Sequence, residues 1–336
     1  MDPLEHRIQA LEEEMRRLVP MRSAEPDLLY GMLHYHLGWA DRDFKPATVD
    51  GGKRIRPLIL LLATEAQGGD WYQALPAAAA VELLHNFTLI HDDIEDQDAL
   101  RRGRDTLWSI WGIPQAINAG DALFALAYRG MLSLSDHGVP EQLALTATRR
   151  FTEAILRITE GQCRDLAFES QDIVDEAAYL QMIEGKTAAL IGLAAELGAI
   201  IAGAQQPNAK ALRDFGEALG KAFQMQDDLL GLWGDPSQTG KPIASDLHNR
   251  KKTLPILHGM ATSPVLRKQL LNPSFDAQDI PQALIELDHT GSRAYTEAQA
   301  RAFHRQALDA LQRSKGCGSA LETLRHLTER LVERQK

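Results

Sequence analysis

The chain has 336 residues, and its 46 acidic side chains outnumber the 36 basic ones by ten. An apolar fraction of 44% is typical of globular proteins and excludes a disordered chain, while the length allows one large core or two modest ones. An acidic chain without a block of Lys and Arg is not expected to bind nucleic acid, because that binding depends on basic charge.

Cysteine content and hydropathy indicate the compartment. Two cysteines, Cys163 and Cys317, are too few for a disulfide framework, which favours the reducing cytoplasm. The charged N-terminal residues 1–18 lack the apolar core of a signal peptide. The most apolar stretch, 188–204, contains Glu196 and is shorter than the ~20 residues that span a bilayer. We expect a cytoplasmic protein without a membrane span.

Helical periodicity dominates the chain. In residues 4–18 apolar side chains recur every three or four positions, which predicts a helix that either packs on its own chain or forms an arm in a dimer. Longer helical runs are predicted from the same periodicity over 75–98, 115–135, 141–170, 176–204, 208–232, 293–313 and 318–335. Breaker-rich segments predict loops over 234–249 and 263–282. The predicted fold class is all-α.

Two groups of carboxylates directly continue or interrupt apolar helices. Asp92 and Asp96 share a helix face about 6 Å apart along the axis, and Asp93 lies beside them. Asp227 and Asp228 interrupt a second apolar helix, where unpaired charge is costly. Mg2+ binds a few carboxylates together with water and phosphate oxygens, so both groups suit a metal–diphosphate site. The alternative for the first group is a solvated acidic helix end.

Basic side chains are clustered as well, which matters because acidic helices that hold a metal–diphosphate need cationic counterparts. The clusters are Lys53, Arg54 and Arg56; Arg101 and Arg102; Lys186, which precedes Thr187; and Lys241, Lys251 and Lys252. Arg binds phosphate through two parallel hydrogen bonds, whereas Lys acts as a point charge. Any one cluster alone would be typical of a solvated surface.

Six motifs, in order, resemble those of the trans-isoprenyl diphosphate synthase (polyprenyl synthetase) family. They are GGKRIRP (51–57), ELLHNFTLIHDDIEDQDALRRG (82–103), GQCRDL (161–166), KTAAL (186–190), FQMQDDLL (223–230) and GKPIASDLHNRKKTLP (240–255). Six motifs in the right order are specific, whereas a lone DDxxD would be weak. The resemblance implies an isoprenoid synthase-type helical bundle around a deep central cavity. It also implies a single synthase domain (29–336) and a homodimer, and we expect residues 1–28, with the periodic helix described above, to form an N-terminal helical extension.

The resemblance also implies a reaction and its residues. A trans-prenyltransferase would condense isopentenyl diphosphate with an allylic diphosphate, using three Mg2+ ions that bridge the aspartate motifs and the allylic diphosphate. The implied metal ligands are Asp92, Asp93, Asp96, Asp227 and Asp228. The implied contacts of the allylic diphosphate are Arg101, Lys186, Thr187, Gln224, Lys241 and Lys251, and those of isopentenyl diphosphate are Lys53, Arg56, His85 and Arg102. The central catalytic set is Asp92, Asp93, Asp96, Lys186, Asp227 and Lys241.

The resemblance also bears on the length of the product, and the sequence departs from the family pattern at two places. Phe87 and Thr88, just before the first aspartate motif, resemble the pattern of twenty-carbon (geranylgeranyl) synthases, although sterics leave a fifteen-carbon (farnesyl) or slightly longer product open. Gly231 stands where the family has a last aspartate, so we expect activity with altered metal affinity. RRGRDT replaces the common RRGKPT, which could reshape the mouth of the cavity. We expect His91 to serve in packing rather than as a general base, and Cys163 to be buried.

Two alternatives remain. A terpene cyclase ionises a prenyl diphosphate without condensation and has no use for a second diphosphate pocket, so Lys53, Arg56, His85 and Arg102 together favour condensation. An inactive regulatory subunit of a heteromeric synthase would fit Gly231, but not the intact DDIED motif.

Overall fold

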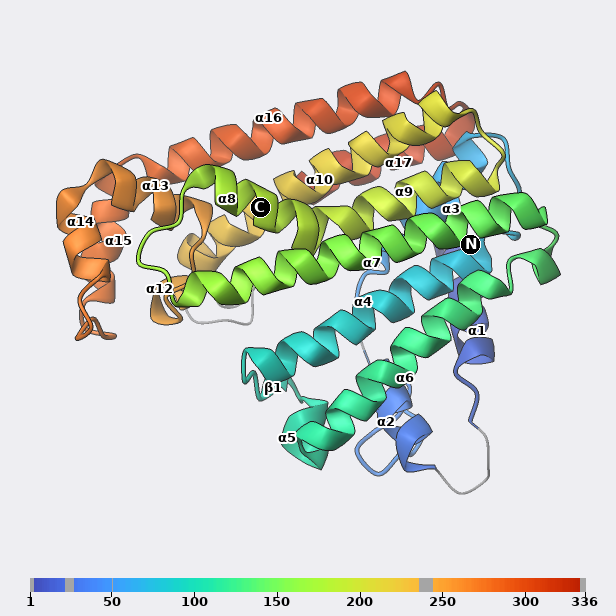
Figure 1. The fold of residues 1–336 in the computed structure, drawn as a ribbon, viewed down its shortest axis with the longest axis horizontal. Helices are drawn as coiled ribbons and strands as arrows, with labels where there is room; N and C mark the ends of the chain where they lie inside the picture. The colour runs from blue at the N-terminus through green and yellow to red at the C-terminus, as the bar shows by residue number, and fades with distance from the viewer. Residues whose placement is uncertain (1–2, 22–26, 50, 236–243, 333–336) are drawn as a thin grey trace. The chain divides into compact units, whose positions relative to one another are not determined.

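The computed structural model describes residues 3–21, 27–49, 51–235 and 244–332, and this part of the chain is predominantly helical (Figure 1). The strands in the described residues, β1 (Leu100–Arg101) and β2 (Arg104–Asp105), form one short antiparallel hairpin. The predicted all-α fold class is therefore confirmed.

The chain divides into two compact units. The first unit comprises residues 1–151, 194–209 and 316–321, and the second comprises residues 152–193, 210–315 and 322–336. The helices wholly within the first unit are α1 (Pro3–Leu18), α2 (Leu28–His36), α3 (Ile55–Ala66), α4 (Leu75–Glu95), α5 (Leu107–Trp111), α6 (Ile113–Leu132) and the 3-10 helix η1 (Ser135–His137). Those wholly within the second unit are α8 (Glu176–Ile183), the π-helical segment η2 (Glu184–Ala188), α12 (Ser245–His248), α13 (Leu254–Thr262), α14 (Pro264–Leu270), α15 (Ile280–His289) and α16 (Ser292–Arg313). Residues of both units occur in α7 (Glu141–Glu169), α9 (Ala189–Ile201), α10 (Gln206–Trp233) and α17 (Gly318–Val332).

The core of the first unit is built on α3, α4 and α6. Helix α3 is apolar on nearly all sides and is buried from Pro57 to Ala66 except at Glu65. Helices α4 and α6 lie side by side (Figure 1). A Cβ atom on Gly130 would approach the carbonyl oxygen of Pro76 to 2.9 Å, so the lack of a side chain permits this close packing.

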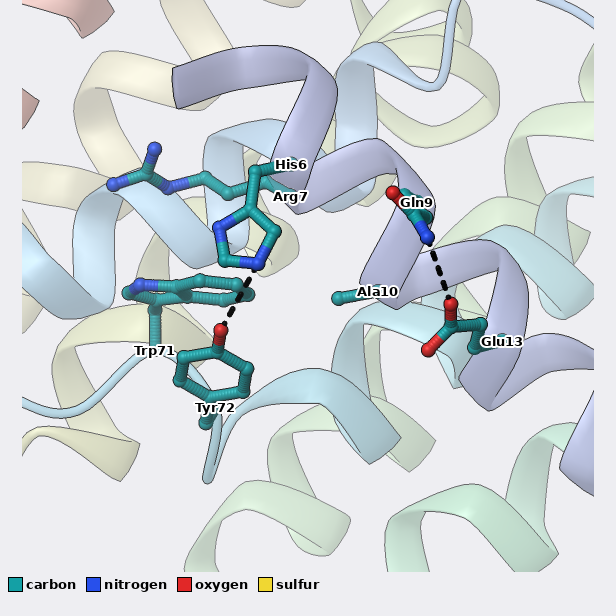
Figure 2. A pocket seen from close by; sticks show the side chains of 7 residues that line it. All are labelled: His6, Arg7, Gln9, Ala10, Glu13, Trp71 and Tyr72. Carbon is teal, nitrogen blue, oxygen red and sulfur yellow. Dashed lines mark hydrogen bonds between the residues drawn. The ribbon is translucent and has the colours of Figure 1, made fainter. Parts of the chain in front are cut away.

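Helix α1 packs on its own chain, the first of the two alternatives for this segment. Leu11, Met15 and Leu18 are fully buried within the first unit. At its N-terminal end, His6 hydrogen-bonds Tyr72, and the Tyr72 ring stacks on that of Trp71 (Figure 2). The open cavity in Figure 2 is lined by these residues, Arg7, Gln9, Ala10 and Glu13, none of which belongs to the predicted site.

Two apolar clusters form the core of the second unit. One joins α8 to α13 and α16 through buried residues that include Tyr179, Met182 and Leu257. The other gathers residues of α10, α12, α13, α14 and α15 around Leu232 and Leu247. Both clusters position the C-terminal half of α10, where the second aspartate motif lies.

The predicted helices 115–135, 141–170 and 208–232 correspond to α6, α7 and α10, and their ends differ by three residues or fewer. Both loop predictions were wrong in part. Residues 245–248 form α12 and residues 264–270 form α14, because Leu247 and Leu266 are buried in the second core despite the breakers around them. Residues 236–243 of the first predicted loop lie outside the described residues.

Helices long and apolar enough to cross a membrane are absent from the described part of the chain. The prediction of a single domain over 29–336 stays a prediction.

Candidate active site

The first aspartate motif lies at the C-terminal end of α4. Asp93 is buried, Asp92 is half-buried, and Asp96 is the residue that caps the helix. Burial raises the pKa of Asp93 to about 6, although the nearby charge of Arg101 opposes this shift. The first motif therefore combines one buried carboxylate with two that solvent reaches.

The hairpin β1–β2 brings Arg101 of the basic motif into contact with Asp93 near the C-terminal end of α4. Arg101 Nε donates to Asp93 Oδ1 at 2.6 Å. The turn at Arg102 and Gly103 has positive φ at both residues, and Gly103 adopts this conformation without strain. Arg104 donates to the carbonyl oxygens of Tyr35 and Ala40. Arg104, a departure from the common motif, thus fixes the hairpin to the C-terminal end of α2 and to the segment that follows it.

Three residues predicted to hold one diphosphate converge within the first unit. Arg56 Nη1 lies 3.2 Å from His85 Nε2, and because Arg can only donate, this imidazole nitrogen is an acceptor. Burial, followed by the charges of Arg56 and Arg102, lowers the pKa of His85 well below its ordinary value. Arg102 lies over Gly52, where a Cβ atom would come within 2.9 Å of Nη1. The charges of both guanidinium groups act on the imidazole of His85, and cationic donors gathered in this way can bind an anion.

The remaining basic residues of GGKRIRP differ in environment. Lys53 is exposed, whereas Arg54 is buried and adopts a left-handed backbone conformation at the start of α3. Arg54 donates to Glu12 and Glu82 at 2.8 and 2.7 Å. The central Arg54 therefore stabilises the fold, joining α1 and α4 to this loop.

In the second aspartate motif the two carboxylates have different environments. Asp227 is exposed, whereas Asp228 is buried and accepts hydrogen bonds from Tyr179 Oη at 2.6 Å, Gln224 Nε2 at 3.0 Å and the backbone N–H of Leu254 at 3.0 Å. Burial raises the pKa of Asp228 to about 7, while these hydrogen bonds oppose the shift. The hydrogen bonds leave little of Asp228 for a metal, and they fix the end of α10 to α8 and α13.

The segment EGKTA forms the π-helical turn η2 between α8 and α9. Its backbone lies against Gly161 of α7, where a Cβ atom would come within 2.8 Å of Lys186 Cα. Lys186 Nζ donates to Asp165 at 2.5 Å, and Thr187 Oγ1 donates to Gln224 Oε1 at 2.8 Å. The motif GQCRDL therefore holds Lys186 in place, because Gly161 permits its close approach and Asp165 binds its side chain. Thr187 is linked to Asp228 through the side chain of Gln224.

Comparisons with known proteins identify the family of this chain. A family model described as polyprenyl synthetase matches residues 40–286. The chain belongs to the polyprenyl synthetase family. It is 40% identical over 312 residues to the (2E,6E)-farnesyl diphosphate synthase of Mycobacterium tuberculosis strain H37Rv, covering 90% of this chain and 86% of that protein.

Two further relatives of this polyprenyl synthetase are informative. The geranylgeranyl diphosphate synthase of the same organism is 48% identical over 226 residues, which is 67% of this chain and 63% of that protein. The crystal structure of a polyprenyl synthetase from Streptomyces coelicolor A3(2) aligns with a TM-score of 0.89 at 37% identity, covering 98% of each chain. The chain is therefore a prenyltransferase with the all-α isoprenoid synthase fold.

The other predicted residues of this synthetase are less informative. Lys251 is exposed, and Lys241 lies outside the described residues. Arg250, which precedes Lys251, donates to the carbonyl oxygens of Pro273 and Phe275 and so anchors that segment.

The residues before the first aspartate motif face α6. The ring of Phe87 lies 5.1 Å from that of Phe124, which in turn packs on Tyr128. Thr88 donates to the carbonyl oxygen of His85 in its own helix. His91 packs on Phe87 and on the bare backbone of Gly120, where a Cβ atom would lie 2.5 Å from His91 Cδ2. This placement favours packing as the role of His91.

Sequence reasoning missed the roles of two residues that shape the site: Tyr179 holds Asp228, and Asp165 holds Lys186. Arg54, named in a basic cluster, is structural. Asp165 lay within the recognised GQCRDL motif, whereas Tyr179 carried no signal of its own. The expected burial of Cys163 was wrong: its side chain is exposed, because it lies on the solvent face of α7.

Proposed function

We propose that this prenyltransferase condenses isopentenyl diphosphate head-to-tail with an allylic diphosphate and gives a short-chain trans-prenyl diphosphate. The main product that we propose is geranylgeranyl diphosphate, with farnesyl diphosphate as the second candidate. The relatives named above are a farnesyl and a geranylgeranyl diphosphate synthase, so both product lengths occur among similar chains. Phe87, backed by Phe124 and Tyr128, supports the shorter end of the product range.

The observation that carries the proposal is the convergence of Arg56, His85 and Arg102. A diphosphate needs several donors and positive charge, and the neutral Nε2 atom of His85 holds one guanidinium in place without adding charge. We assign isopentenyl diphosphate to this group, together with exposed Lys53. An enzyme that only cyclises one prenyl diphosphate would not need this group.

The residues present fit Mg2+ as the metal. Their donors are carboxylate oxygens, the ligands that Mg2+ prefers. Among the described residues no group of three or more His, Cys, Asp or Glu side chains could hold a metal ion by itself, so the proposed ions would also need water and diphosphate oxygens as ligands. We assign the metal to Asp92, Asp93 and Asp96 and to Asp227. Bound Mg2+ would neutralise charge on the diphosphate and make it a better leaving group.

The chain's own residues would hold and orient the allylic diphosphate. Lys186 is fixed by Asp165, and Arg101 by Asp93, so both cations keep one position while the substrate binds. As the allylic C–O bond breaks, these cations would stabilise the charge that grows on the departing diphosphate. We propose that Thr187 and Gln224 orient the same group, that Lys241 and exposed Lys251 bind it, and that Asp228 positions Asp227.

Three further parts of the proposal rest on the resemblance and on composition. We propose that the two units function together as one synthase domain, that Mg2+ binds as three ions per site, and that the protein is a homodimer. Two unpaired cysteines, Cys163 and Cys317, support a cytoplasmic location.

The test is incubation of the purified protein with Mg2+, labelled isopentenyl diphosphate and each allylic primer in turn, followed by sizing of the labelled products. We expect label in a twenty-carbon product. A lack of label with every primer would reject condensation and favour a regulatory subunit, and a cyclic hydrocarbon from geranylgeranyl diphosphate alone would identify a cyclase. Asp288→Asn, at an exposed position on α15, is a control that should leave the products unchanged.

A further inference from the structure

The C-terminal end of α10 lacks a side chain where a carboxylate would be expected. Gly231 lies four residues after Asp227, one helical turn along the same face. Gly within a helix costs about 1 kcal/mol relative to Ala, so its presence here calls for a steric reason.

Asp246 provides that reason. A Cβ atom built on Gly231 would lie 2.5 Å from Asp246 Cγ and 2.8 Å from Asp246 Oδ1, closer than the 3.0 Å limit that real Cβ atoms keep. The carboxylate of Asp246 therefore occupies the space into which any side chain at position 231 would project. It reaches the face of α10 that carries Asp227, one turn further along.

The packing of α12 holds Asp246 in this place. Ala244 and Leu247 on either side are buried in one apolar cluster with Leu232 of α10. Ser245 Oγ donates to the carbonyl oxygen of Gly231 at 3.3 Å, and the backbone N–H of Lys251 donates to the carbonyl oxygen of Asp246 at 2.8 Å. The backbone position of Asp246 is thus set by its neighbours.

Asp246 is also an electrostatic neighbour of the second motif. The raised pKa of Asp228 results mainly from burial, and the charge of Asp246 contributes to it. Burial likewise raises the pKa of Tyr179, and the charges of Asp228, Asp246 and Asp227 raise it further. The charge of Asp246 therefore acts on the same end of α10 that carries Asp227 and Asp228.

We propose that Asp246 provides the outer carboxylate of the second aspartate motif, in the space that Gly231 leaves open, and thereby strengthens Mg2+ binding. This inference rests on the proposed function, because Mg2+ is the metal of that reaction. It changes the expectation drawn from Gly231: the chain keeps the outer charge and supplies it from a different segment. In this chain Gly231 leaves the space that the carboxylate of Asp246 occupies.

The first test measures Mg2+ binding without turnover. Mg2+ is titrated calorimetrically into the protein saturated with inorganic diphosphate. Asp246→Asn keeps the shape of the side chain and removes its charge. We therefore expect this variant to bind Mg2+ at least about tenfold more weakly than the unchanged protein, which is the size of effect seen when groups around a metal are changed. Asp288→Asn removes an exposed charge from the same unit and should bind as the unchanged protein does. Affinity within twofold of the unchanged protein in Asp246→Asn would overturn the proposal.

The second test moves the carboxylate back to α10. Gly231→Asp alone should clash with Asp246 and lower the melting temperature, whereas Gly231→Asp combined with Asp246→Ala should fold and recover most of the Mg2+ affinity lost in Asp246→Ala. A folded double variant with no recovery would overturn the proposal. If the unchanged protein incorporates isopentenyl diphosphate but both tests fail, only the role of Asp246 is rejected. If it binds neither Mg2+ nor diphosphate, the proposed function fails first.

Discussion

Replacement of Tyr179 by Phe tests how the second aspartate motif is held. Tyr179 donates to Asp228 at 2.6 Å, and both side chains are buried in the second unit. A hydrogen bond to a charged group contributes about 1.5–3 kcal/mol and a neutral one about 1 kcal/mol. Loss of the hydroxyl should therefore raise the pKa of Asp228 above its value of about 7 by up to ~1.5 units.

The sign of the pH dependence follows from the direction of the shift. Because burial raises the folded-state pKa of Asp228 above its ordinary 3.8, the stability that this group contributes is complete below pH 3.8 and is lost as the pH rises through about 7. In Tyr179→Phe this loss continues to higher pH. We expect the variant to be destabilised by about 1 kcal/mol at pH 6 and by about 1.5–3 kcal/mol at pH 9.

The measurement is urea unfolding at both pH values in the presence of EDTA, which removes divalent metal. Tyr295→Phe is a matched control, because it removes a hydroxyl that donates to Glu176 in the same unit and does not reach Asp228. In an Asp228→Asn background the extra loss at pH 9 should disappear. Equal destabilisation by Tyr179→Phe at pH 6 and pH 9 would refute the reasoning.

Three other outcomes are expected. Arg54→Met should lower the free energy of unfolding by about 3–5 kcal/mol, because it leaves the carboxylate of Glu82 buried without its cationic partner; a loss of less than about 1 kcal/mol in urea unfolding would contradict this. Phe87→Ala should lengthen the product seen by chromatography, with Phe124 still limiting growth, and an unchanged chain length would reject Phe87 as a limit. Chelation of Mg2+ by EDTA should abolish label incorporation and added Mg2+ should restore it, whereas activity that persists in EDTA would exclude a metal requirement.

Periodicity and motifs predicted much of this protein, because both depend on neighbours along the chain. The long helices were found to within a few residues, since one face of each is apolar. The motifs located the aspartate clusters and the basic group around His85. What the sequence could not show depends on contacts between distant segments. Burial turns Arg54 from a binding candidate into a fold-stabilising residue, and packing on Leu232 folds residues 245–248 into a helix.

The same reason explains the asymmetry between Asp227 and Asp228. Adjacent identical residues look equivalent in sequence, but on a helix they point about 100° apart. One reaches solvent, and the other meets Tyr179 and the start of α13. Local spacing predicted the pair, whereas the partners that distinguish its members come from segments 49 and 26 residues away.

The π-helical turn Glu184–Ala188 changes the phase of the helix in which it lies. Such a turn accommodates one residue more than an α-helical turn, and one residue corresponds to about 100° of rotation. Tyr179 before the turn and the buried face of α9 after it therefore need not follow a single helical register. Deleting one residue within the turn would restore a continuous α-helix and rotate Lys186 away from Asp165. Residue count in this segment is thus as strict a requirement as residue identity, and relatives that work in the same way should conserve its length.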